Sequence, residues 1–158
     1  MNTFEQLIGK KIINVLRLDI KEDYDLGFPI ALFLQLDNVS GLLVGQDFNH
    51  DTTTVSYTTL EVVRDDYDTE FKETHLNELK STDRLNSLVG QTIISIKVGE
   101  FDQDKLLGDN FVLKQGQYAG VIIEVDNQRL TIFNNGIYSE ILFNSDSLFP
   151  NRQSWTLK

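Results

Sequence analysis

A nine-residue segment near the N-terminus returns in the middle of the chain. Residues 7–15 read LIGKKIINV and residues 88–96 read LVGQTIISI. The identical positions are Leu7/Leu88, Gly9/Gly90, Ile12/Ile93 and Ile13/Ile94. Similarity within one chain is the signature of a structural unit that occurs more than once, so this segment constrains the fold more than any other. One match alone is weak support, because glycine before an isoleucine pair is common in strand sequences.

A second pair of segments keeps the same order. Residues 32–38 read LFLQLDN and residues 121–127 read VIIEVDN, with one polar interruption at the same place. The spacing is 90 − 9 = 81 in the first pair and 126 − 37 = 89 in the second, so the second copy has about eight extra residues, which we place in residues 101–117. We therefore predict two similar halves from an internal duplication, residues 1–80 and 81–158, with approximate two-fold symmetry and two equivalent cores. The alternative is that both pairs are generic strand-and-turn sequence.

Strand patterns dominate both halves. Five consecutive apolar residues begin at Ile30, which is typical of a central strand covered on both faces. Residues 134–136, Asn-Asn-Gly, separate apolar segments and predict a tight hairpin. Residues 52–63 are rich in threonine, valine and tyrosine and predict one long strand. The predicted fold class is α+β, mainly antiparallel β-sheet with a few short helices.

The two halves are joined by the acidic residues 64–80. Within them, four residues recur at a spacing that places them near one helical face, namely Phe71, His75, Leu76 and Leu79. We predict that the first half ends in an acidic linker helix.

The chain is strongly acidic. It has 14 basic and 24 acidic residues, a net charge of −10, which argues against phosphate-backbone partners and favours a basic partner. The simpler explanation is that acidic surfaces keep proteins soluble. No apolar run reaches the ~18 residues of a membrane span, the first residues lack a basic signal region, and there is no cysteine. We expect a soluble cytoplasmic protein without disulfide bonds.

No segment has the spacing of a known reactive centre. The chain lacks a Gly-x-Ser-x-Gly nucleophile motif and a glycine-rich phosphate loop. Asp47-x-Asn49-x-Asp51 begins like a calcium loop, but the glycine and glutamate that should follow are threonines. His75-x-x-Glu78 occurs once, whereas carboxylate-bridged metal centres need such a motif twice. We predict no catalytic residue, no metal ion and no cofactor.

Two acidic segments surround aromatic residues. Charge speeds the encounter with a basic protein, and aromatic rings supply anchors that lose their water on binding. The candidate partner-binding residues are Asp23, Tyr24, Asp25, Asp65, Asp66, Tyr67, Asp68 and Glu70. The alternative is that both segments are solvated loops.

These features predict a small acidic cytoplasmic binding protein that neutralises a basic protein, as an immunity protein neutralises a bacterial toxin or nuclease. The rival hypothesis is a small-ligand-binding protein or an enzyme with a pocket at the seam between the two halves. A nucleic-acid mimic is a third hypothesis. The sequence predicts no nucleic-acid partner, no membrane partner and no particular oligomeric state.

Overall fold

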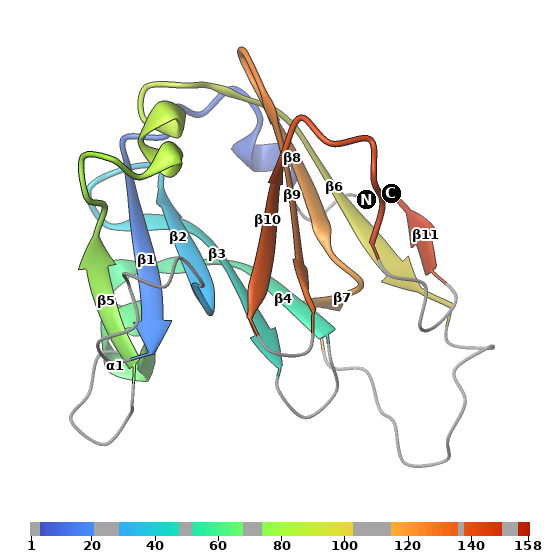
Figure 1. The fold of residues 1–158 in the computed structure, drawn as a ribbon, viewed down its shortest axis with the longest axis horizontal. Helices are drawn as coiled ribbons and strands as arrows, with labels where there is room; N and C mark the ends of the chain where they lie inside the picture. The colour runs from blue at the N-terminus through green and yellow to red at the C-terminus, as the bar shows by residue number, and fades with distance from the viewer. Residues whose placement is uncertain are drawn as a thin grey trace.

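Two antiparallel sheets stand face to face in the computed structural model, which describes residues 4–20, 29–47, 52–67, 74–102, 115–135, 138–149 and 155–158 (Figure 1). In order of neighbours, the first sheet consists of β5 (Thr74–Glu78), β1 (Asn14–Ile20), β2 (Ala31–Gln35), β3 (Ser40–Asp47), β4 (Thr52–Thr59) and β7 (Gln117–Tyr118). The second sheet consists of β10 (Ser139–Phe143), β9 (Arg129–Asn134), β8 (Val121–Val125), β6 (Ile93–Phe101) and β11 (Trp155–Leu157). The helical segments are η1 (Glu5–Leu7), α1 (Leu60–Tyr67) and η3 (Arg84–Leu88).

The pairings confirm the predicted fold class. Each pair of neighbouring strands in the described residues is antiparallel, and the helical segments are short. The chain is therefore α+β with mainly antiparallel sheet. Within the described ranges, no helix has the length and apolar character needed to cross a membrane.

Strand β2 is the central strand that the sequence predicts. It lies between β1 and β3, and its residues 31–34 are all buried. Leu32 and Leu34 face the second sheet, whereas Ala31 and Phe33 pack on the opposite side. Because successive side chains of a strand point to opposite faces, a continuous apolar run needs cover on both sides.

The two sheets share one core, which corrects the prediction of two equivalent cores. The largest cluster of buried residues includes Val15 and Leu34 from the first sheet together with Ile96 and Ile123 from the second. In addition, β7 follows β6 in the chain but pairs with β4 of the first sheet. Each sheet therefore buries its inner face against the other.

The predicted linker helix is wrong. Helix α1 begins and ends earlier, and residues 74–78 form strand β5, which pairs along β1 with His75 opposite Asp19. Leu76 packs with the outer cluster of the first sheet and Leu79 with the core between the sheets. The backbone groups at the free edge of β1 outweigh the helical spacing of the apolar side chains.

The predicted long strand over residues 52–63 is also too long. Strand β4 ends at Thr59, where α1 begins. The Thr59 hydroxyl accepts a hydrogen bond from the backbone N–H of Val62 at 3.2 Å. A threonine in this position satisfies one of the free donors at a helix N-terminus and favours the change from strand to helix.

The two sheets have matching strand orders. Apart from the two-residue β7, the first has the order β5-β1-β2-β3-β4 and the second has the order β11-β6-β8-β9-β10. Among these strands, the last in sequence lies beside the first in each sheet. The registers match as well, since Val15 lies opposite Leu34 and Ile96 lies opposite Ile123. These are pairs that the sequence alignment of the two halves makes equivalent.

The repeated segments pair with each other where the two sheets meet. Lys11 and Thr92 form an antiparallel bridge. Around it, the backbone N–H groups donate reciprocally, from Gly9 to Ile93 O (2.8 Å), Gly90 to Ile12 O (2.7 Å), Ile12 to Gln91 O (2.8 Å) and Ile93 to Lys10 O (2.9 Å). We call this four-bond arrangement the central joint. Each donor in it has an equivalent donor in the other segment.

Alanine at Gly9 or Gly90 should reduce stability by the same amount. Both glycines have positive φ, +87° and +88°, and a Cβ added at either would meet no atom within 4 Å. The cost is therefore conformational, about 1–2 kcal/mol in free energy of unfolding for each alanine variant. Urea unfolding followed by Trp155 fluorescence measures it. Asparagine, which tolerates positive φ, should cost less at both positions, and a cost at one glycine alone would contradict the equivalence.

Candidate binding sites

The predicted partner-binding residues are only partly described. Asp65 and Asp66 are exposed on helix α1, and Tyr67 is its last residue. The remaining predicted residues lie outside the described part of the chain, namely Asp23, Tyr24, Asp25, Asp68 and Glu70. Their role stays a prediction.

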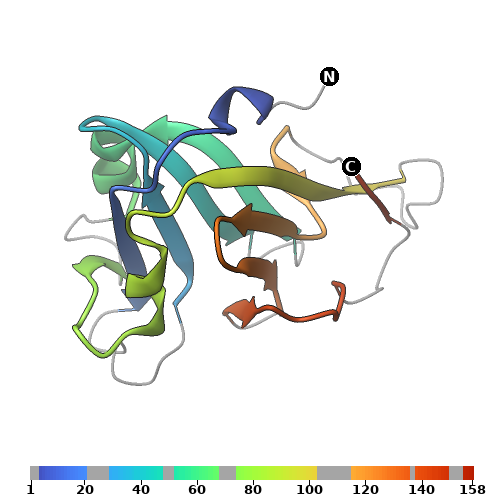
Figure 2. The same ribbon diagram turned by 90° about the horizontal axis from the view of Figure 1, so that it is seen from above.

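Helix α1 lies on the outer face of the first sheet, away from the second sheet (Figure 2). Val63 is fully buried and packs with Leu16, Phe33 and Leu43, while Leu60 is partly buried in the same cluster. These contacts hold one side of the helix against the sheet. They leave the opposite side of the helix facing solvent.

The solvent side of α1 is mainly acidic. Glu61, Asp65 and Asp66 are exposed there, with Arg64 as the one base among the described residues of the helix. Val62 lies between them in sequence and is 45% exposed. We call these residues, Glu61, Val62, Asp65 and Asp66, the α1 surface. It combines negative charge with an apolar side chain that a partner can cover.

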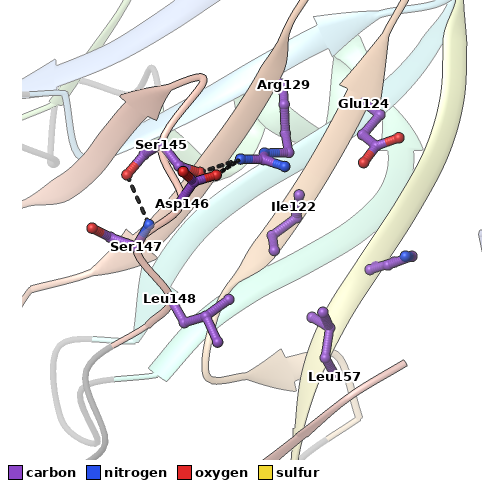
Figure 3. Close-up of a pocket in the computed structure, with 9 residues that line it drawn as sticks. Ile122, Glu124, Arg129, Ser145, Asp146, Ser147, Leu148 and Leu157 are labelled. Carbon is purple, nitrogen blue, oxygen red and sulfur yellow. Dashed lines mark hydrogen bonds and ion pairs between the residues drawn. The ribbon is translucent and has the colours of Figure 1, made fainter.

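A pocket lies on the outer face of the second sheet (Figure 3). It has a volume of about 190 Å³ and opens between strands β6, β8 and β9, strand β11 and the segment that follows β10. Its lining residues are Lys97, Ile122, Glu124, Arg129, Ser145, Asp146, Ser147, Leu148 and Leu157. The rival hypothesis from the sequence places a pocket at the seam between the halves, whereas this one is lined by residues of the second half alone.

Strand register brings the charged lining residues together. Lys97 of β6 lies opposite Ile122 of β8, and Glu124 of β8 lies opposite Arg129 of β9. Since side chains alternate between faces, Ile122 and Glu124 share the outer face, while their neighbour Ile123 belongs to the core between the sheets. The sheet therefore supplies an apolar floor with charges on three adjacent strands.

Arg129 holds the segment that forms the far wall of the pocket. Its guanidinium donates to the carbonyl oxygen of Ser145 and pairs with the Asp146 carboxylate at 3.1 Å. Asn144 makes the turn into this segment with φ +54°, and its Oδ1 accepts from the backbone N–H of Arg129 at 2.9 Å. Further along, Phe149 is buried on the sheet and fixes the end of the wall.

The charges in the pocket differ in whether they are already paired. Arg129 and Asp146 neutralise each other. By contrast, the side chains of Lys97 and Glu124 form no hydrogen bond or ion pair with any residue in the described part of the chain. An incoming ligand can therefore contact one cation and one anion without displacing a protein partner.

Sequence reasoning missed this pocket. Its lining residues come from three separate strands, the segment that follows β10 and the C-terminal segment. No local spacing signals such a site. Within the described ranges, no group of three or more His, Asp or Glu side chains could hold a metal ion.

Comparisons with known proteins give no family for this chain. No family model matches it, and neither a curated protein nor a solved structure does.

Proposed function

We propose that this chain is a small acidic binding protein whose partner is a basic protein, bound at the α1 surface. The observation that carries the proposal is the arrangement of Glu61, Asp65 and Asp66 around the exposed Val62, on a helix whose other side is anchored by buried Val63. Negative charge speeds the encounter with a basic surface, and an apolar side chain covered at the centre contributes affinity. Neutralisation of a basic bacterial toxin or nuclease by an immunity protein is a function of this kind.

The overall charge supports the same proposal. The net charge of −10 extends beyond α1, so the field around the molecule attracts cationic proteins over a distance of about one Debye length, ~8 Å at physiological salt. In this proposal the anchored helix supplies the specific contact, and the remaining acids increase the association rate.

We also infer that the two sheets derive from one duplicated module. Three observations support this inference: the matching strand order, the equivalent registers and the reciprocal backbone hydrogen bonds of the central joint. Exposure matches too, since Ile8 and Val89 are 45% and 44% exposed, and Ile13 and Ile94 are 42% and 49% exposed. On this inference α1 is a feature of the first half, because the corresponding described residues of the second half form an extended wall instead.

The test is affinity capture from a lysate of the native cell followed by binding kinetics. The wild-type chain should retain a basic protein in stoichiometric amount. The double variant Asp65→Asn/Asp66→Asn should associate with it several-fold more slowly, and added salt should reduce the difference, because charges at the rim of an interface act mainly on association. The variant changes charge while keeping side-chain size.

A matched control removes two acids elsewhere. Glu5→Gln/Asp126→Asn takes away the same charge from η1 and from the β8–β9 turn, where both residues are exposed. It should leave the binding kinetics close to those of the wild type. If both double variants slow association equally, the effect comes from the overall charge and the α1 surface is not the binding site. Recovery of a small molecule and no protein would overturn it.

A further inference from the structure

We propose that the pocket on the outer face of the second sheet binds a small zwitterion with an aliphatic group, of the size of a single amino acid. The observation is a pocket in which Lys97 and Glu124, neither of them paired with a described residue, flank an apolar floor. Figure 3 shows Glu124 with the apolar Ile122, Leu148 and Leu157. The proposal is independent of the α1 surface, which lies on the other sheet.

The volume of the pocket limits the ligand. At about 190 Å³ it is smaller than the ~300–1,000 Å³ pockets that hold drug-sized molecules. A ligand of roughly ten non-hydrogen atoms fills such a space. Nucleotides and most cofactors are much larger than this volume, whereas a single small metabolite matches it.

The floor of the pocket calls for an aliphatic group. Ile122, Leu148 and Leu157 line it, and Ile122 is buried while Leu148 is 55% exposed. A branched aliphatic chain lying on Ile122 would cover Leu148 and Leu157 as well. Removing their apolar surface from water contributes about 25 cal/mol per Å² of buried area.

Two free charges call for a ligand that carries both signs. Lys97 lies directly across from Ile122, and Glu124 is two residues further along β8 on the same face. Diagonal neighbours of this kind are about 7–8 Å apart at their Cα atoms, and the two side chains do not form an ion pair. A zwitterion placed between them presents its carboxylate to Lys97 and its ammonium group to Glu124.

The other two charged residues of the pocket, Arg129 and Asp146, stabilise its wall. Arg129 is engaged by Asp146 and by the Ser145 carbonyl, so it positions the wall and does not compete with Lys97 for the ligand carboxylate. Lys97 and Glu124 are therefore the residues that contact the charged groups of the ligand.

The experiment is a titration of the isotope-labelled full chain, with L-leucine as the probe and NMR detection. The expected dissociation constant is about 1 mM, typical for so few atoms, with shifts centred on the amides of Lys97, Ile122 and Glu124. Two analogues each lack one charge: 4-methylpentanoate has no ammonium group and isoamylamine has no carboxylate. Both should bind more weakly than leucine, as should glycine, which lacks the aliphatic group.

Two substitutions separate the charge contacts. Lys97→Gln should weaken leucine and 4-methylpentanoate binding about 10- to 100-fold and leave isoamylamine binding unchanged. Glu124→Gln should do the reverse, weakening leucine and isoamylamine. The matched controls are Lys11→Gln and Glu5→Gln, which remove one exposed charge of each sign away from the pocket.

Several outcomes would overturn the proposal. They are the absence of shifts at the solubility limit of leucine, shifts centred on another part of the molecule, equal binding of the singly charged analogues, and equal losses in the control variants. Because Lys97 and Glu124 are solvent-facing rim residues, circular dichroism should show all four variants folded. A failure here would leave the capture experiment on α1 unaffected.

Discussion

Replacing Arg17 by methionine should lower the free energy of unfolding by about 3–5 kcal/mol, because it leaves buried carboxylates without their cation. Arg17 is 5% exposed and Asp19 is fully buried. The guanidinium contacts Asp19 at 2.7 Å and Asp83 at 2.9 Å. Burial on its own would lower the pKa of Arg17, but its hydrogen bonds to Asp19 and Asp83 outweigh burial and raise the pKa. The Arg17 guanidinium therefore stays protonated over the accessible pH range.

This network joins elements that are far apart in sequence. Asp19 also accepts a hydrogen bond from Asn77 of β5 at 3.1 Å, and Asp83 accepts one from the backbone N–H of Leu85 at the start of η3 at 2.9 Å. Loss of Arg17 therefore affects β1, β5 and η3 together. Urea unfolding followed by circular dichroism measures the effect.

The matched control for Arg17 is the exposed arginine of α1. Arg64→Met removes the same charge at the surface and should change the free energy of unfolding by less than about 0.5 kcal/mol. If Arg17→Met costs no more than Arg64→Met, the buried network does not stabilise the fold as argued.

Replacing Phe149 by alanine should cost about 3–5 kcal/mol of stability and open the pocket. The ring is 4% exposed, lies 6.3 Å from the Phe133 ring and 5.0 Å from the Trp155 ring, and covers Gly99 and Gly120. Without it, the wall that ends at residue 149 loses its anchor. Trp155 is the only tryptophan, so its fluorescence should shift to the red in the folded variant.

Gly120 provides a test of the same contact from the sheet side. A Cβ at this position would overlap the Phe149 ring and lie 2.9 Å from the backbone oxygen of Ile132, so Gly120→Ala should cost about 1–3 kcal/mol by overpacking. Gly120→Ala combined with Phe149→Ala should cost less than the sum of the single variants, since the second change removes the ring that the first one strikes. Leu148→Ala, at an exposed neighbour, should cost below about 1 kcal/mol. If the losses in free energy of unfolding at Gly120 and Phe149 are additive, the two residues do not pack against each other.

Much of the fold follows from local sequence. The central strand beginning near Ile30 and the strand pairings around Asp37 and Asp126 follow from apolar runs and turn residues. The strand conformation of residues 74–78 does not follow from local sequence, because these residues pair with an edge of β1 that exists only once the sheet has formed. The end of β4 does have a local sequence signal, because Thr59 is a residue type that caps helices. The high β propensity of the surrounding threonine, valine and tyrosine residues hides this signal.

The candidate sites differ in how far sequence can predict them. Asp65 and Asp66 were predicted as acids beside an aromatic residue, but the apolar member of the described surface is Val62, and only the helix places it on the solvent side. The pocket could not be predicted, because Lys97 and Glu124 meet only through the register of β6 and β8. Composition sets the sign of the surface charge, and tertiary pairing sets its location.

The central joint restricts how such a chain can be divided. Its four backbone donors each use an acceptor from the other segment, and the side chains of Leu7, Ile12, Leu88 and Ile93 are buried in a core supplied by both sheets. A fragment holding one segment alone would present unmet hydrogen-bonding groups next to bare apolar surface. A second copy of that fragment, turned by half a revolution, offers the same acceptors, so dimerisation is the route by which a lone half could become stable.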